Sequence, residues 1–216
     1  SAASDVYKRQ RYAPSLSLPP EVRATTDMRA AVAGAGIVVV ALPSQLARGA
    51  IEPLAGAVEP GALVVSLMKG IELGTRMRMS EVLAQVLGVP GERVAVVSGP
   101  NLADEIAVRQ PTATVVASSS QDTAAAVAAA CATATFRPYT NNDVLGVELC
   151  GAVKNVIALA VGMAAGRGLG DNSKATLITR GLVEITRLGL ALGARPETFS
   201  GRHGGPGGYL LLPAEP

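Results

Sequence analysis

Four short apolar runs, rich in β-branched residues, constrain the fold of this chain more than any other feature. They lie at 37–42 (IVVVAL), 62–67 (ALVVSL), 94–98 (VAVVS) and 113–117 (ATVVA). Continuous runs of this kind are typical of strands buried on both faces of a parallel sheet, because a half-exposed strand would alternate apolar and polar residues. Stretches that can form helices separate the runs, so the sequence predicts a doubly wound parallel α/β sheet with right-handed crossovers.

Shorter elements complete this first part. We expect further strands at 22–25 and 135–139, and helices at 28–33, 44–57, 77–87, from 102 onwards and at 121–132. Asp27 has a side chain favoured at an N-cap, so it should start the helix at 28–33. Near Asn141 the strands stop. Beyond it, 144–163 predicts one long buried helix and 173–192 a second, which marks a domain boundary.

Composition excludes several classes of protein. Aromatic residues make up only 3% and the formal net charge is +2, without a basic cluster, so we expect no binding to nucleic acid. Cys131 and Cys150 are the only cysteines, which is too few for a disulfide framework and lacks metal-ligand spacing. We therefore expect no metal site and a reducing cytoplasm. Charges interrupt the apolar runs, so no membrane span and no signal peptide are expected.

Lys154 is the most unusual residue of the predicted helix at 144–163, whose only other strongly polar side chains are Glu148 and Asn155. A buried, isolated ammonium is costly, so such a lysine usually has a function. Gly151 lies on the same helical face and would leave room for a ligand. Alternatively, Lys154 reaches solvent and Gly151 only eases helix packing.

Ligands of open α/β sheets bind at the carboxyl ends of the strands. Ser44 follows the first predicted strand, Lys69 and Gly70 follow the second, and the Ser98–Asn101 turn follows the third. Together with Lys154 they predict a shared cleft, in which one lysine binds an anionic substrate and the other, desolvated, exchanges a proton at neutral pH. Lys69 as a solvated loop residue and Gly99-Pro100 as an ordinary turn remain alternatives.

Six stretches carry a resemblance to a known family. They are RYAPSLSLPPEVRATTD (11–27), GIVVVALPSQ (36–45), SLMKGIE (66–72), VSGPNLADEIA (97–107), GVELCGAVKNVIALAVGM (146–163) and GLGDNSKATLITRGLVEITRLGLALGARPETFSG (168–201). In this order and spacing the chain resembles the bacterial NAD(P)-dependent glycerol-3-phosphate dehydrogenases.

The resemblance implies a Rossmann-type α/β domain, lacking its N-terminal part, at 11–140 and part of an all-α substrate domain at 141–201. It leaves 1–10 and 202–216 unassigned. The implied activity interconverts sn-glycerol 3-phosphate and dihydroxyacetone phosphate with NAD or NADP, and supplies glycerophospholipid precursors in the cytoplasm. The implied partner is a small phosphorylated substrate, and a homodimer is consistent with the family.

The resemblance also implies residue roles. Lys154 would be the general acid/base that exchanges a proton with the C2 hydroxyl, in contact with the substrate. Lys69 would contact the substrate and the nicotinamide end of the cofactor. Gly99 and Asn101 would line the substrate site, and Ala103 the cofactor site.

Two departures from the family accompany these matches. No Gly-x-Gly-x-x-Gly motif is present, and from Arg202 the sequence RHGGPGGYLLLPAEP replaces the family's Gly-Leu-Ala-Gly-x-Gly-Asp, whose aspartate partners the catalytic lysine. We expect no catalytic role for His203 in this segment. The departures predict an incomplete, inactive and poorly stable form with an open apolar edge at the 37–42 strand.

Two other functions remain open. A dehydrogenase of the 3-hydroxyacid or 6-phosphogluconate type also has a Lys-Asn pair on such a helix, but its substrate is a carboxylate and the SGPNLADEIA run disfavours it. A degenerate binding or scaffold protein that has lost its chemistry is the non-enzymatic alternative.

Overall fold

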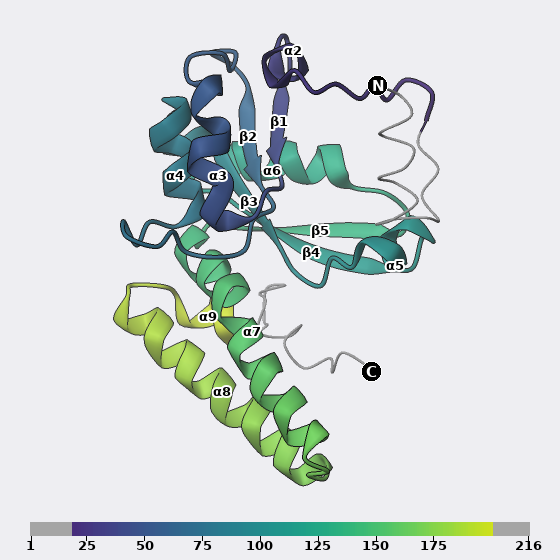
Figure 1. Cartoon of the computed structure of the whole chain (residues 1–216), viewed down its shortest axis with the longest axis vertical. Helices are drawn as coiled ribbons and strands as arrows, with labels where there is room; N and C mark the ends of the chain where they lie inside the picture. The colour runs from purple at the N-terminus through teal and green to yellow at the C-terminus, as the bar shows by residue number, and fades with distance from the viewer. Residues whose placement is uncertain (1–18, 201–216) are drawn as a thin grey trace.

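The computed structural model describes residues 19–200 and shows a sheet covered by helices, from which a pair of long helices projects (Figure 1). The five strands lie in the order β1-β2-β3-β4-β5. They are Ile37–Val40 (β1), Leu63–Ser66 (β2), Val94–Ser98 (β3), Thr112–Ala117 (β4) and Phe136–Asn141 (β5). The helices among them are Met28–Val32 (α2), Ser44–Ile51 (α3), Met79–Leu87 (α4), Ala103–Ala107 (α5) and Gln121–Cys131 (α6), with short 3-10 turns at Glu52–Leu54 (η1) and Gly91–Arg93 (η2).

Helices cover both faces of the sheet, as predicted for a doubly wound fold. On one face, Val38 and Val64 pack in a core with Ile51 of α3 and Leu83 of α4. On the other face, the side chains of β2, β3 and β4 pack against α6 in a second core, formed by Val65, Ala95, Val97, Val116, Ala124 and Val127. The alternation of faces along each strand explains why these runs contain almost no polar residue.

The sheet is not wholly parallel, which corrects the prediction. β1, β2 and β3 are parallel and β4 is parallel to β5, but β4 runs antiparallel to β3 with Ser98 opposite Val115. A helix that recrossed a five-residue strand of about 16 Å would need about eleven residues. The connecting helix α5 has five residues and none of them is buried, so the chain turns back instead of crossing over.

Two predictions about the first strands are wrong. Residues 22–25 form no strand and Val22 is 54% exposed; within residues 19–200 no strand lies beyond β1 to pair with them. The β1 strand is buried on one face only, because Val39 is 56% exposed. The helix on that side, α6, packs against β2, β3 and β4. Among residues 19–200, β1 is the edge strand of the sheet, with Val39 exposed, in agreement with the apolar edge expected there.

Two long helices, Val144–Gly166 (α7) and Asp171–Ala191 (α8), lie side by side and project away from the sheet, followed by Pro196–Ser200 (α9) (Figure 1). The prediction that α7 is buried along its length is wrong. Its first two turns are buried, whereas Val156 is 69% and Met163 is 62% exposed. The reason is geometric: only the beginning of α7 meets the sheet, at β3 and β4.

By length and composition alone, the 23-residue α7 could cross a membrane. Its beginning is packed in a core, since Val147 is fully buried against Val96, Val115 and Ala117 of the sheet. A core helix of a folded domain passes the same test of length and composition, so α7 is weak evidence for a membrane span.

Asp143 joins the start of α7 to the chain beyond α8. Its carboxylate is buried and accepts hydrogen bonds from the Gly146 N–H at 2.9 Å, the Arg195 N–H at 2.8 Å and the Thr198 hydroxyl at 2.6 Å. The first bond caps α7, and the other two hold α9 against it. A single side chain therefore joins the start of α7 to α9 and the residue before it.

We predict that Asp143→Ala lowers the free energy of unfolding by about 2–4 kcal/mol, from the lost cap and from buried donors left unpaired. Asp27→Ala is the matched control, because Asp27 caps the exposed helix α2 and its bonds within residues 19–200 are all local. Asp27→Ala should lower the free energy of unfolding by only ~0.5–2 kcal/mol. Urea unfolding of both variants is the measurement, and equal losses would contradict the joining role of Asp143.

Candidate active site

The two lysines predicted for a shared cleft meet at the carboxyl ends of the parallel strands. Lys69 follows β2 and donates a hydrogen bond to the carbonyl oxygen of Gly99, just after β3, at 3.1 Å. Partial burial, followed by charge repulsion and a side-chain hydrogen bond with the neighbouring Lys154 of α7, lowers the pKa of Lys69 to about 8. The Lys69 side chain is exposed over part of its length, but its amine is hydrogen-bonded, and the structure brings residues of β2, β3 and α7 together.

Gly151 allows this approach. A Cβ atom at Gly151 would lie 2.9 Å from the Oγ of Ser98 and 3.8 Å from the Cγ of Lys69. A larger residue would overpack the contact with the Ser98 hydroxyl at the end of β3. The space beside Gly151 is therefore taken by Ser98 of the same chain, which supports the helix-packing interpretation rather than the approach of a ligand.

The prediction that Lys154 is a fully buried ammonium is wrong. Lys154 is half-buried and Asn155 is exposed. Sequence periodicity alone cannot show that α7 leaves the sheet one turn after Gly151. Lys154 nevertheless lies beside Lys69, as a site shared by the two lysines requires.

The turn after β3 is stiffened by Thr114, a residue that the sequence interpretation missed. Gly99 has φ of +155°, and a Cβ there would lie 3.2 Å from the Cα of Thr114. The Thr114 hydroxyl donates to the Ser98 carbonyl at 3.1 Å and accepts from the Asn101 amide at 3.1 Å. The signal in the sequence was a hydroxyl residue within the apolar run at 113–117, and the structure shows that Thr114 is fully buried.

Asn101 presents an unused acceptor at this turn. Its Oδ1 atom is buried and has no hydrogen-bond partner among the described residues. Buried polar atoms are nearly always paired, so an orphaned oxygen in a turn beside Lys69 is a candidate contact for a ligand. Ala103 begins the short helix α5 and is exposed; its predicted cofactor contact stays a prediction.

Helix α3 holds the loop that carries Lys69. Gln45 accepts from the Leu73 N–H at 2.9 Å and donates to the Ile71 carbonyl at 2.8 Å, and Arg48 forms two hydrogen bonds of 2.9 Å with the Glu72 carboxylate. These contacts fasten the loop after β2 to α3.

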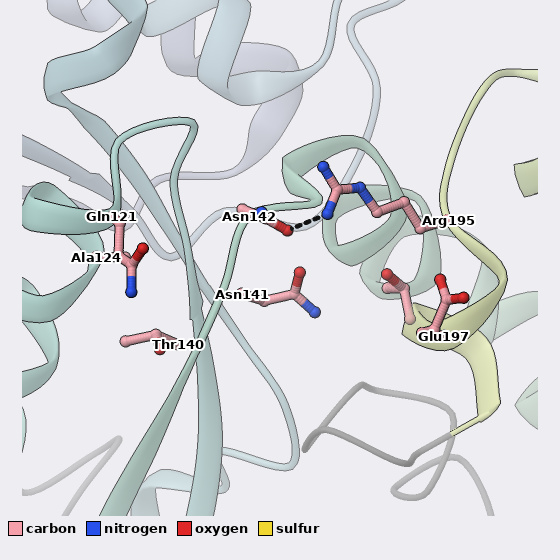
Figure 2. A pocket seen from close by; sticks show the side chains of 8 residues that line it. Gln121, Ala124, Thr140, Asn141, Asn142, Arg195 and Glu197 are labelled. Carbon is pink, nitrogen blue, oxygen red and sulfur yellow. Dashed lines mark hydrogen bonds between the residues drawn. The ribbon is translucent and has the colours of Figure 1, made fainter.

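The pocket drawn in Figure 2 lies elsewhere, between the start of α6, the end of β5 and α9. It has a volume of about 450 Å³ and a largely polar lining, and Arg195 crosses it to donate to Asn142 at 2.7 Å. It contains none of the predicted site residues. The volume of a pocket does not by itself make it an active site, and the lowered pKa of Lys69 beside Lys154 is the stronger indication of chemistry.

We predict that Gly151→Ala destabilises the protein by ~1–3 kcal/mol, because the added methyl group overpacks the contact with Ser98. Gly162→Ala, on the same helix, is the matched control. Nothing lies within 4 Å of a Cβ at that position, so the substitution should stabilise α7 by ~0.5–1 kcal/mol. Opposite signs in urea unfolding are expected, and equal signs would show that α7 does not approach β3 closely.

The lowered pKa of Lys69 predicts a pH-dependent stability. Below about pH 8 both the folded and the unfolded chain hold the proton, and folding bears the full cost of burying the ammonium. Between about 8 and 10.5 only the unfolded chain remains protonated, so this cost falls and stability rises with pH. The free energy of unfolding relative to Lys69→Met should therefore rise across this window. A constant difference in urea titrations would contradict the burial of Lys69 beside Lys154.

Known proteins share this architecture. Residues 4–124 match the family model described as the NAD-dependent glycerol-3-phosphate dehydrogenase N-terminus, and residues 143–207 match the model of its C-terminus. A glycerol-3-phosphate dehydrogenase (NAD(P)+) of Frankia casuarinae is 60% identical over 194 residues, which are 90% of this chain and 58% of the relative. One of Streptomyces griseus is 56% identical over 203 residues, 94% of this chain and 60% of the relative.

A solved structure agrees with these matches. The crystal structure of glycerol-3-phosphate dehydrogenase from Coxiella burnetii superposes with a TM-score of 0.87 at 34% identity, covering 98% of this chain and 66% of that one. The chain spans about 60% of the length of the Frankia and Streptomyces relatives. With both family models matching in order along the described fold, the chain belongs to the NAD-dependent glycerol-3-phosphate dehydrogenase family.

Proposed function

We propose that this chain carries the lysine pair of an NAD(P)-dependent glycerol-3-phosphate dehydrogenase, which interconverts sn-glycerol 3-phosphate and dihydroxyacetone phosphate. The observation that carries the proposal is the meeting of Lys69 and Lys154 at the carboxyl ends of β2 and β3. The names of the Frankia and Streptomyces relatives support the same substrate pair. Membership in this family disfavours a 3-hydroxyacid or 6-phosphogluconate activity.

The pair suits an anionic substrate. Within residues 19–200, none of the ion pairs between side chains includes Lys69 or Lys154. Two neighbouring ammonium groups without a carboxylate repel each other, and a phosphorylated ligand would relieve that repulsion. With a pKa of about 8, Lys69 is mostly protonated at pH 7 and serves as the point charge. Lys154 is assigned the exchange of the proton at the C2 oxygen, as general acid or base.

The described residues fit the nicotinamide end of the cofactor. The turn after β3 offers the buried Oδ1 of Asn101 as an acceptor for a hydroxyl or carboxamide donor, and Gly99 keeps that turn close to β4. Lys69 lies beside the same turn, and Ala103 begins the helix that follows it. A nicotinamide cofactor supplies the hydride when bound, and the residues named here position and neutralise the substrate.

The finer organisation belongs to the same proposal. Residues 11–140 form the dinucleotide-binding part and residues 141–201 the helical substrate part, which is supported by the end of the sheet at β5. We assign the protein to the cytoplasm, in agreement with the free thiols of Cys131 and Cys150. A homodimer is the proposed assembly, and the exposed apolar side chains along α7 and α8 are compatible with further packing.

The test is a chimeric enzyme in which residues 19–200 replace the matching segment of the Frankia casuarinae relative. It should reduce dihydroxyacetone phosphate with NADH or NADPH, and Lys154→Ala should lower kcat by ~10²–10⁴-fold, as expected for a lost general acid/base. Lys69→Met should chiefly raise the KM for the phosphorylated substrate, because it removes a point charge.

Lys174→Ala is the matched control, since Lys174 pairs with Asp171 on α8 and contacts neither lysine of the pair. It should leave both constants unchanged. Near-normal turnover by the Lys154→Ala chimera would refute its catalytic role. A folded chimera that binds cofactor but shows no turnover would favour the non-catalytic alternative.

A further inference from the structure

Glu148 is a buried carboxylate on α7 that the proposed chemistry does not use. Its side chain lies six residues before Lys154 and is only 4% exposed. It accepts hydrogen bonds from the Ser80 N–H at 2.8 Å, from the Ser80 hydroxyl at 2.5 Å and from Nη1 of Arg78 at 3.2 Å. All three donors come from the start of α4, so the carboxylate joins α7 to a helix on the sheet.

Holding a carboxylate here has a cost. Burial raises the pKa of Glu148, while the bonds from Ser80 and the charge of Arg78 act in the opposite direction and Glu81 adds to the rise. The positive end of the α4 dipole also favours the anion. Buried ionic groups are often no more stabilising than apolar ones of similar size, so their retention points to a role in specifying geometry.

The contacts of Arg78 show which geometry is specified. Arg78 pairs with Ile71 in an isolated antiparallel bridge, and Ile71 lies two residues after Lys69. Arg78 also binds Glu81, which holds its side chain at the start of α4. A continuous path therefore runs from the Lys69 loop through Arg78 to Glu148, and along two turns of α7 to Lys154.

Gly151 closes the same path from the other side. It lies between Glu148 and Lys154 on α7 and contacts Ser98 at the end of β3. Glu148, Gly151 and Lys154 are three residues apart, so they lie on neighbouring parts of the helix surface. Glu148 faces α4, Gly151 faces β3 and Lys154 faces the Lys69 loop. Rotation or withdrawal of α7 would separate the lysines, and Glu148 is the charged contact that opposes it.

We propose that Glu148 is a positioning residue, which holds Lys154 of α7 against the Lys69 loop through its bonds to Arg78 and Ser80. The proposal rests on the proposed function, because that function assigns the roles of the two lysines. It concerns placement alone, since Glu148 touches neither lysine.

The test measures the pKa of Lys69 in the 216-residue protein, with lysine labelled by carbon-13 at the ε position. The sequence contains four lysines, so the spectrum is simple and Lys→Arg variants assign it. Lys154→Met should raise the pKa of Lys69 and defines the effect of losing its neighbour. Glu148→Gln should raise the pKa of Lys69 by at least half as much as Lys154→Met does, because α7 then moves Lys154 away from Lys69. Glu92→Gln, an exposed acid before β3, should change nothing.

The sign of the shift separates positioning from simple electrostatics. Removing an anion without moving α7 would lower the pKa of Lys69, because a nearby negative charge favours an ammonium. An unchanged or lowered pKa in folded Glu148→Gln therefore overturns the proposal. If Glu148→Gln does not fold, Ser80→Ala removes one bond, keeps the carboxylate and should give a smaller rise; no rise there also overturns it. If Lys154→Met leaves Lys69 unshifted, the lysine pair of the proposed function fails instead.

Discussion

The contact between Gly151 of α7 and Ser98 of β3 is the constraint on which the rest of the site depends. It is the point where a long apolar helix lies close to a strand end, and an added Cβ atom there would overlap the Ser98 hydroxyl. On one side of the contact, Val147 packs into the core of the sheet. On the other, Lys154 reaches the neighbourhood of Lys69, whose amine loses solvent and proton affinity as a result.

Polar anchors then decide how the helix lies over that contact. Asp143 fastens its beginning to the chain around α9, and Glu148 fastens its second turn to α4. Contacts between apolar side chains such as Val, Leu and Ala have no fixed direction, so they restrain the rotation of a helix about its axis only weakly. Hydrogen bonds to buried carboxylates are directional and do not permit such rotation. The bonds of Asp143 and Glu148 therefore give a mostly apolar helix a single orientation relative to the sheet.

Local patterns predict the elements well and their surroundings less well. The strand at 94–98 has its predicted bounds, the helix starting after Asp27 has its predicted cap, and the residues at the ends of β2 and β3 converge as expected. The reversal of β4 escaped prediction because it depends on how little α5 can span. The partial exposure of Lys154 and the bond from Arg78 to Glu148 depend on contacts between residues far apart in sequence, which no periodicity encodes.

The antiparallel strand β4 sets which groups donate and which accept hydrogen bonds in the turn after β3. A threonine hydroxyl has one proton, and that of Thr114 is directed to the Ser98 carbonyl. Its lone pairs can only accept, which turns the NH₂ group of Asn101 toward β4 and its oxygen the other way. This corner can therefore receive a proton donor and would repel a bare phosphate oxygen. Under the proposed function, a ligand that carries a phosphate at one end and a hydroxyl or amide elsewhere would bind with its anionic end toward the lysines.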